Sequence, residues 1–322
     1  MSAIIDEVLE ILAQNRQKPI SGESIAVRLR ISRNAVWKAV NTLKKQGFYI
    51  TASTNSGYCL YDDIVTRKGM QNCGFGSEVR IFHSLSSTND YLKAEAEKSK
   101  EGLVVIARNQ TQGRGRMGRK FFSPPNTGLY ISILLKPKMQ AEEAVKITTM
   151  AGVAVCRAIE FFSNEKAQIK WVNDVFVSGK KVCGILTEAS VNVENGGMNY
   201  AVLGIGVNLY EPLDGFSEEL RDIAGAVFQL GAESYADRFA CELLRQFFLL
   251  YNGQSYIEEY KERSLLTGRE ITYMMQGKEK RAIVLGIDDH FGLIVKDDAG
   301  NREILRSGEV RVKYDKNQNK ND

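Results

Sequence analysis

The first sixty residues carry three helical patterns in succession, and this succession restricts the fold more than any other feature of the chain. Apolar residues recur at helical spacing over residues 4–12, so a first helix is predicted to end near Asn15. Ser21 stands before a second, short helix, and Ser32 stands before a third that runs to Gly47. Two short helices joined by a tight turn are typical of the helix-turn-helix motif.

A predicted β-hairpin follows these helices. Residues 48–61 alternate apolar and polar side chains on either side of an Asn55-Ser56-Gly57 turn. Three helices and a hairpin predict a winged helix over residues 1–62. On the third helix, the side chains outside the apolar stripe are of types that reach base edges and phosphates in a major groove. Together with residues at the helix starts, they form the predicted DNA-binding set: Ser21, Gly22, Ser32, Arg33, Asn34, Trp37, Lys38 and Asn41.

The distribution of charge favours a nucleic-acid partner for this unit. The chain has 43 Lys and Arg residues against 39 Asp and Glu residues, an excess of four. Residues 1–60 hold eight basic and four acidic residues, so the whole excess lies in the predicted winged helix. A phosphate backbone is the natural partner of such a unit. The alternative is a protein-binding module with an incidentally basic surface, because helix-turn-helix geometry also serves protein contacts.

Length and composition limit the compartment and the kind of site. A chain of 322 residues is expected to form two or three domains. It shows no signal-peptide pattern and no run of about 18 apolar residues, which predicts a cytoplasmic protein without membrane contact. With two histidines, a histidine-rich metal site is excluded, and no protein metal site is predicted. The cysteines form no C-x-x-C motif and are expected to be buried, reduced thiols: Cys59, Cys73, Cys156, Cys183 and Cys241.

Beyond a predicted linker over residues 63–76, strand and helix patterns alternate to residue 262. The predicted strands cover residues 79–82, 103–107, 129–135, 169–171, 175–177, 182–188 and 200–208, and the predicted helices cover 88–98, 142–162, 217–230 and 236–254. Hairpins mixed with helices favour an α+β domain over a doubly wound parallel sheet. Residues 263–316 hold five short strand patterns that predict a small β-barrel, and residues 317–322 predict a disordered tail.

A glycine- and arginine-rich loop is the most informative stretch of this middle region. Residues 113–118 match the G-x-G-x-x-G pattern of dinucleotide-binding turns, but residues 120–125 cannot propagate the helix that such a turn must open, so the match is rejected. Between Glu101 and Glu142 the chain has seven basic residues and no acid. Arginines on a glycine-rich loop surround an anion with guanidinium and backbone N–H groups, which predicts a carboxylate or phosphate ligand. A flexible basic loop that contacts nucleic acid is the alternative.

A second cluster lies in the segment Lys170-Trp171-Val172-Asn173-Asp174 and at Lys181. A lysine at the start of an otherwise apolar strand can place its ammonium beside a bound carboxylate or phosphoryl group. Most lone lysines at strand ends are simply exposed, so the residues alone leave both interpretations open.

Four segments, in their order and spacing, resemble biotin protein ligases: Ser87-Thr88-Asn89, Gly113 to Arg119, Lys170 to Asp174 and Lys181 to Leu186. With the winged helix, the chain is similar to the bifunctional bacterial type, which is both biotin operon repressor and biotin ligase. Phe121 and Val172 depart from the family, which often has tryptophan and proline there. Both keep an apolar contact and remove no charged or hydrogen-bonding group.

The resemblance implies a fold and a reaction. A central mixed-sheet ligase domain, similar to class II aminoacyl-tRNA synthetases, would precede an SH3-like β-barrel. Biotin and ATP would form biotinyl-5′-AMP with release of pyrophosphate, and biotin would then pass to a lysine of a carrier domain. Mg²⁺ is expected with ATP, held mainly by substrate oxygens. A lipoate protein ligase is an alternative, although the glycine–arginine loop is of the biotin type.

The resemblance also implies site residues. Lys181 and Arg116 would be catalytic. Biotin would be bound by Ser87, Thr88, Asn89, Gln110, Arg114, Gly115, Arg116 and Lys181. ATP and the adenylate would be bound by Arg114, Arg116, Arg119, Lys170, Trp171, Asn173 and Asn208.

The implied partners are the biotin carboxyl carrier domain of acetyl-CoA or pyruvate carboxylase, operator DNA, and a second copy of the chain in a homodimer that biotinyl-AMP favours. A ligand-sensing transcription factor without ligase activity is the other alternative. The presence of Arg114, Arg116, Arg119 and Lys181 argues against it.

Overall fold

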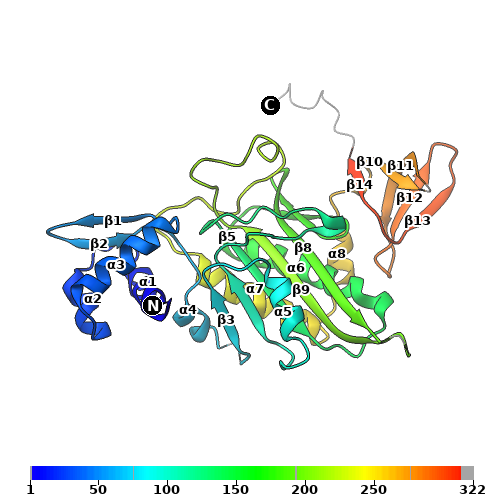
Figure 1. Ribbon diagram of the computed structural model, residues 1–322. Coiled ribbons are helices and arrows are strands. Elements are labelled where there is room, and N and C mark those ends of the chain that lie inside the picture. Colours follow the sequence, from blue (N-terminus) through cyan, green and yellow to red (C-terminus); the bar gives the residue numbers. More distant parts are fainter. Residues whose placement is uncertain (1, 75, 193, 276, 313–322) are drawn as a thin grey trace, which may run out of the picture.

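The computed structural model describes residues 2–74, 76–192, 194–275 and 277–312, and it places three units side by side (Figure 1). The first unit consists of α1 (Ser2–Gln14), α2 (Gly22–Leu29), α3 (Arg33–Lys45), β1 (Ile50–Ser53) and β2 (Gly57–Leu60). Its predicted helix caps are confirmed, because Ser21 Oγ and Ser32 Oγ accept hydrogen bonds from backbone N–H groups three residues later, at 3.0 and 3.1 Å. The helices and the hairpin share a hydrophobic core of their own. The predicted tail at 317–322 lies outside the described residues.

A short helix, α4 (Arg67–Asn72), connects the first unit to the second and lies inside the segment predicted to be a linker. Thr66 caps it, since Thr66 Oγ1 accepts a hydrogen bond from the N–H of Gly69 at 2.9 Å. Thr66 in turn donates from its N–H and its hydroxyl to the carboxylate of Asp237, at 2.7 and 2.8 Å. Six residues with one buried apolar side chain, Met70, are too few to show a helical period in the sequence.

The central unit is built on a seven-stranded sheet with the order β3-β4-β5-β9-β8-β7-β6. The β3–β4 pair is parallel and the other pairs are antiparallel, so the sheet is mixed, as expected. The strands are β3 (Val79–Phe82), β4 (Val104–Ala107), β5 (Gly128–Leu135), β6 (Ala167–Lys170), β7 (Asp174–Val177), β8 (Lys180–Val191) and β9 (Met198–Asn208).

Helices cover both faces of this sheet (Figure 1). The helix α6 (Ala144–Phe162) packs with α7 (Ala236–Tyr251) and with alternate strand residues such as Ile133 in the main core. On the other face, α5 (Thr88–Glu95) buries Leu92 against Leu134 in a smaller core. The alternation of side chains along β5 therefore serves two hydrophobic cores.

The predicted helix over residues 217–230 is wrong, since this segment is a chain of turns. Its backbone pairs with strand ends instead: Lys181 N–H donates to Ile223 O at 2.8 Å, and Val227 N–H donates to Asn208 O at 2.9 Å. The spacing of apolar residues in this segment fits a helix, and these inter-segment hydrogen bonds override that local preference. A short helix that was not predicted, α8 (Ile257–Glu262), leads into the last unit.

The third unit is a five-stranded antiparallel sheet with the order β13-β12-β11-β10-β14. All five predicted strands are confirmed: β10 (Glu270–Met275), β11 (Lys278–Ile287), β12 (Leu293–Asp297), β13 (Arg302–Leu305) and β14 (Val310–Val312). Trp171 Nε1 donates a hydrogen bond of 2.7 Å to Phe291 O, and the ring of Phe291 packs against Tyr260 of α8. These contacts hold the third unit against the end of β6.

The expectation of five reduced thiols is wrong for two of them. Cys73, directly after α4, and Cys241, in α7, form a disulfide. Cys59, Cys156 and Cys183 are buried and free. A pairing between residues 168 positions apart leaves no trace in the local cysteine spacing from which the expectation was drawn.

The described ranges hold neither a membrane-spanning helix nor a clustered metal site. None of their helices combines the length and the apolar character needed to cross a membrane. No group of three or more His, Cys, Asp or Glu side chains among them is placed to hold a metal ion.

Candidate functional site

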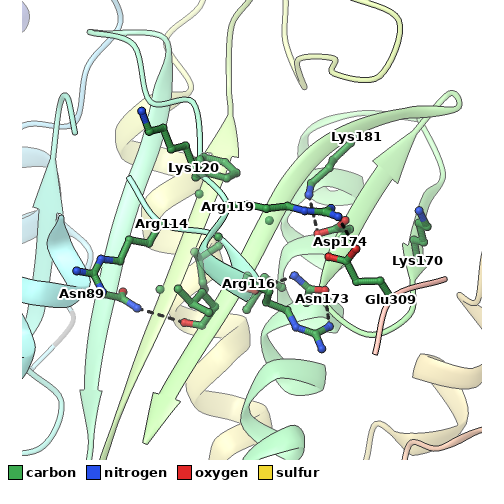
Figure 2. A pocket seen from close by; sticks show the side chains of 18 of the residues that line it. Asn89, Arg114, Arg116, Arg119, Lys120, Lys170, Asn173, Asp174, Lys181 and Glu309 are labelled. Atoms are coloured by element: carbon green, nitrogen blue, oxygen red, sulfur yellow. Dashed lines mark hydrogen bonds and ion pairs between the residues drawn. The ribbon is translucent and has the colours of Figure 1, made fainter. Parts of the chain in front are cut away.

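A cavity of about 220 Å³ opens over β8 and β9, between the glycine–arginine loop and the third unit (Figure 2). It brings together twelve of the thirteen residues predicted to bind biotin or the nucleotide: Ser87, Thr88, Asn89, Gln110, Arg114, Gly115, Arg116, Arg119, Lys170, Trp171, Asn173 and Lys181. The thirteenth, Asn208, is not among the lining residues, and its Nδ2 donates to Gly225 O at 3.0 Å.

Two paired glycines form a floor without side chains of its own in this cavity. Gly184 of β8 and Gly206 of β9 are direct cross-strand partners, and the ring of Phe121 lies over both. A Cβ added to Gly206 would lie 2.4 Å from a ring carbon of Phe121, a distance that requires the ring to shift. The next glycine on β9, Gly204, leaves room in the same way for the amide of Asn89. A flat ring can therefore lie directly on the backbone here, as Phe121 does.

The polar groups beside this floor are held by a network of hydrogen bonds. Gln110 Oε1 accepts from the N–H and the hydroxyl of Thr88 at 2.9 and 3.1 Å. Ser132 Oγ lies 2.7 Å from Thr88 Oγ1 and 2.6 Å from Asn89 Oδ1, and Asn89 Nδ2 donates to Glu188 at 2.8 Å. Because Thr88, Asn89 and Ser132 are all buried, their orientations are fixed before a ligand enters. The sequence did not single out Ser132 or Glu188.

The glycine–arginine loop folds back on itself as a tight turn. Gly115 N–H donates to Arg119 O at 2.7 Å, and both Met117 and Gly118 at the tip have positive φ angles, 54° and 74°. A single short turn of 3₁₀ helix, Arg116–Gly118, is all the helix that the loop contains. This geometry agrees with the rejection of the dinucleotide-binding pattern, which must open a full helix.

Cations gather at the other end of the cavity, where Figure 2 shows Arg119, Lys181, Asp174 and Glu309 close together. Lys181 Nζ lies 2.7 Å from a carboxylate oxygen of Asp174, and Arg119 forms an ion pair with Glu309. Arg116 Nη1 donates to Asn173 Oδ1 at 3.1 Å. These partners fix the directions of the cationic groups and leave further N–H donors that can meet anionic oxygens.

Two further cationic residues, Arg114 and Lys170, line the cavity near carboxylates. Arg114 Nε lies 3.1 Å from a carboxylate oxygen of Asp90, on the side of the cavity where Figure 2 shows Asn89. Burial lowers the pKa of Lys170 below its ordinary value, and the nearby carboxylate of Asp174 opposes this shift.

The third unit contributes a wall that the sequence did not predict, made of Gly308, Glu309, Val310 and Arg311. Glu309 pairs with Arg119, and Gly308 O lies 3.5 Å from Arg116 Nη2. The sequence around Glu309 gave no sign of this contact, because Glu309 directly precedes a strand of a separate unit.

The predicted DNA-binding residues lie in the first unit, and none of them is among the residues that line the cavity. Arg33, Asn34 and Lys38 on α3 are exposed, and 55% of the Trp37 surface is exposed. Arg33 lies 3.4 Å from Glu23 in an exposed ion pair. The face of α3 that carries these side chains is therefore accessible to a partner.

Comparison with known proteins places these features in a family. Residues 81–208 match the Biotin/lipoate A/B protein ligase family, and residues 5–59 match the HTH domain. The chain is 33% identical over 239 residues to the bifunctional ligase/repressor BirA of Bacillus spizizenii, covering 72% of this chain and 73% of the relative. The corresponding protein of Escherichia coli is 27% identical over 304 residues, covering 90% and 94%.

A solved structure shares the fold. The biotin protein ligase from Aquifex aeolicus in complex with biotin and ATP matches with a TM-score of 0.61 at 23% identity, over 74% of this chain and 99% of that one. Together with the sequence relatives, the HTH match and the ligase-family match, this likeness leads to one conclusion: the chain belongs to the family of bifunctional biotin ligase/repressor proteins.

Proposed function

We propose that this protein joins biotin to ATP to form biotinyl-5′-AMP, transfers the biotin to a lysine of a carboxylase carrier domain, and represses transcription when its winged helix binds operator DNA. The observation that carries the proposal is the division of the cavity. A glycine floor with fixed polar groups lies at one end, and arginine and lysine side chains lie at the other. Biotin divides in the same way, into a bicyclic head that carries a polar ureido group and a carboxylate that must meet a phosphate.

The first half-reaction brings two anions together, so the site must hold both against their repulsion. A carboxylate oxygen of biotin attacks the α-phosphorus of ATP, an O–P bond forms, and the bond to the leaving pyrophosphate breaks. We assign Arg116 and Lys181 to the oxygens where charge develops, because both cations are already held in place by Asn173 and Asp174. Fixed cations of this kind lower the barrier without reorganising during the reaction.

Lys181 is positioned by its backbone as well as by its ion pair. Its N–H donates to Ile223 O at 2.8 Å, and its carbonyl accepts from Gly225 N–H at 2.9 Å. An ammonium has three N–H donors, so the contact with Asp174 leaves two for substrate oxygens. Arg114 and Arg119 would hold the carboxylate and phosphate groups, and Lys170, Trp171 and Asn173 would line the nucleotide.

In the second half-reaction, the amine of a carrier-domain lysine attacks the carbonyl carbon of the adenylate, an amide forms and AMP leaves. Mg²⁺ is expected to shield the ATP phosphates. Asp174 and Glu309 are already paired with Lys181 and Arg119, so a Mg²⁺ ion would be held mainly through substrate oxygens.

The finer points of the proposal follow the family resemblance. The carrier domain would belong to acetyl-CoA or pyruvate carboxylase, the adenylate would favour a homodimer, and the protein would act in the cytoplasm. Dimerisation would place two winged helices on one operator and raise the avidity for DNA. The similarity of the central unit to class II aminoacyl-tRNA synthetases and the closure of the third unit into an SH3-like barrel belong to the same proposal.

The deciding experiment is biotin-dependent exchange of pyrophosphate into ATP, run beside the same assay with lipoate. We expect exchange with biotin only, and at least a roughly 100-fold loss in Lys181→Ala, the usual scale for removing one group that stabilises developing charge. Lys180→Ala is the matched control, because Lys180 Nζ binds the carbonyl oxygens of Arg221 and Asp222 and does not line the cavity. Preference for lipoate, or no exchange at all, would overturn the ligase assignment, and full activity of Lys181→Ala would remove Lys181 from the mechanism.

A further inference from the structure

The disulfide between Cys73 and Cys241 lies outside the ligase cavity and has no part in the reaction proposed above. Cys73 follows the last residue of α4, and Cys241 lies in the second turn of α7, with 5.4 Å between their Cα atoms. The bond therefore joins the short helix between the winged helix and the ligase unit to a long helix of the main core.

Residues 66–73, which end at Cys73, form the joint between the winged helix and the ligase unit. The N–H of Arg67, at the start of α4, donates to the carboxylate of Glu10 in α1 at 3.1 and 3.2 Å. On the other side, Thr66 donates to Asp237 of α7. The disulfide thus adds a covalent bond to a joint that is otherwise held by hydrogen bonds, ion pairs and the burial of Met70.

Reagents in solution can reach this disulfide. Both cysteines are partly exposed and lie on the wall of a second cavity, about 490 Å³ in volume, with Arg238 and Arg245 beside them. Exposed disulfides are the ones that thiols reduce readily.

The three remaining cysteines lie in a different environment. Burial raises the pKa of the Cys156 thiol to about 12 and that of Cys183 well above its ordinary value. Cys59 is buried within the winged helix. Buried thiols of this kind are inert, so the chain separates one accessible pair from three protected residues.

We propose that Cys73 and Cys241 form a reversible thiol–disulfide site that fastens α4 to α7 when oxidised and releases it when reduced. In the reduction, a thiolate of a dithiol attacks one Sγ, the Cys73–Cys241 bond breaks, and the electron pair leaves on the other sulfur, which takes a proton. The second thiol of the reductant then attacks the mixed disulfide. The products are two cysteine thiols and the disulfide of the reductant, and a dithiol in its oxidised form reverses the sequence.

The test uses the full-length native protein without biotin, ATP or DNA, so its outcome is independent of the proposed ligase and repressor functions. One sample is incubated with reduced dithiothreitol and the other with its oxidised form. Both are alkylated with a maleimide under native conditions and digested for mass spectrometry. We expect Cys73 and Cys241 to be labelled after reduction and unlabelled after oxidation, with Cys59, Cys156 and Cys183 unlabelled in both.

Hydrogen exchange provides the second readout. Backbone amides of residues 67–73 should exchange roughly tenfold faster in the reduced protein, because the joint opens more often without the covalent bond. Cys73→Ser should exchange at the reduced rate under both conditions, and Cys156→Ala, as the matched control, should respond like the unmodified chain. If either variant fails to fold, maleimide labelling of the unmodified chain still tests whether the disulfide is reversible. Equal labelling of Cys73 and Cys241 in both samples, or a disulfide that opens only in denaturant, refutes the proposal.

Discussion

A buried ion pair connects the winged helix to the end of β4 in the ligase unit, and breaking it tests how the two units are held together. Arg108 follows β4 and precedes the glycine–arginine loop, and its Nη2 lies 3.4 Å from a carboxylate oxygen of Glu10 in α1. The exposed fractions of the two side chains are 6% and 14%. Burial lowers the pKa of Arg108, and the charge of Glu10 opposes this shift.

The substitution Glu10→Gln removes the charge and keeps an oxygen that can accept from the N–H of Arg67. Removing one partner of a buried pair usually costs about 3–5 kcal/mol, because the other charge stays buried without compensation. We expect the lower end, about 3 kcal/mol, since Asp6 lies close enough to compensate Arg108 in part and Nη2 keeps a hydrogen bond to Val65 O. A change of 3 kcal/mol corresponds to a roughly 160-fold increase in opening of the joint.

Native-state hydrogen exchange measures this opening residue by residue. The amides of Gly69 and Met70 bond to Thr66 inside the joint, so their exchange rates should rise by about two orders of magnitude in Glu10→Gln. Glu7→Gln is the matched control, because Glu7 lies on an exposed part of the same helix and its loss should change stability by less than about 0.5 kcal/mol. Equal exchange in Glu10→Gln and the unmodified chain would refute the idea that this ion pair holds the joint.

Two further predictions concern the joint and the floor of the cavity. Burial raises the pKa of Asp237 to about 6, although hydrogen bonds from Thr66 oppose the shift, so the folded joint favours the neutral carboxyl. Its contribution to stability should be lost as the pH rises from about 4 through 6, and thermal unfolding of Asp237→Asn should lack this part of the pH dependence. In Gly206→Ala, the new Cβ would meet the ring of Phe121 at 2.4 Å, so biotin affinity measured by calorimetry should fall at least roughly tenfold, a loss of about 1.4 kcal/mol. Gly76→Ala, with no atom within 4 Å of the added Cβ, should bind biotin normally.

The sequence predicts this fold well where a local rule acts. Ser21 and Ser32 mark helix starts because a hydroxyl that accepts from the third following N–H is a property of a few neighbouring residues. The strands of the third unit follow from alternation and turns in the same way. Residues 217–230 fail because their spacing fits a helix while their hydrogen bonds go to β8 and to the end of β9, which no local pattern reveals.

In the candidate site, too, the residues that belong to local motifs were predicted and those brought in by long-range contacts were not. The cations of the site and the segment Ser87-Thr88-Asn89 belong to recognisable sequence motifs, and the structure places them together. Ser132 and Glu188 lie within strands and Glu309 directly precedes one, and none of the three stands in a recognisable motif. Their importance comes from the side chains they orient across 43, 99 and 190 positions. The Cys73–Cys241 pairing was missed for this reason as well.

The balance of charge in the cavity leads to a last prediction: biotin binding and DNA binding should respond differently to salt. The acid-free stretch of residues 102–141 suggests a strongly positive site, but acids from other segments meet its cations there: Asp90 pairs with Arg114, and Glu309 pairs with Arg119. Lys181, outside that stretch, is likewise paired with an acid. Biotin therefore enters a site in which Arg114, Arg119 and Lys181 already have counter-charges, and its affinity should depend weakly on salt.

On the exposed face of α3, Arg33 and Lys38 meet solvent, and their contacts with phosphates would release counterions. Each such contact adds about 0.9 to the slope of log affinity against log salt, so two contacts predict a roughly tenfold loss of DNA affinity between 50 and 200 mM salt. Over the same range we expect biotin affinity, measured by calorimetry, to change less than about twofold, since paired and partly enclosed charges are screened less. Lys38→Ala should lower the DNA slope by about 0.9 and leave biotin binding unchanged. A parallel loss of both affinities with salt would contradict the charge balance described for the cavity, because an unpaired cationic site would respond to salt as the DNA-binding face does.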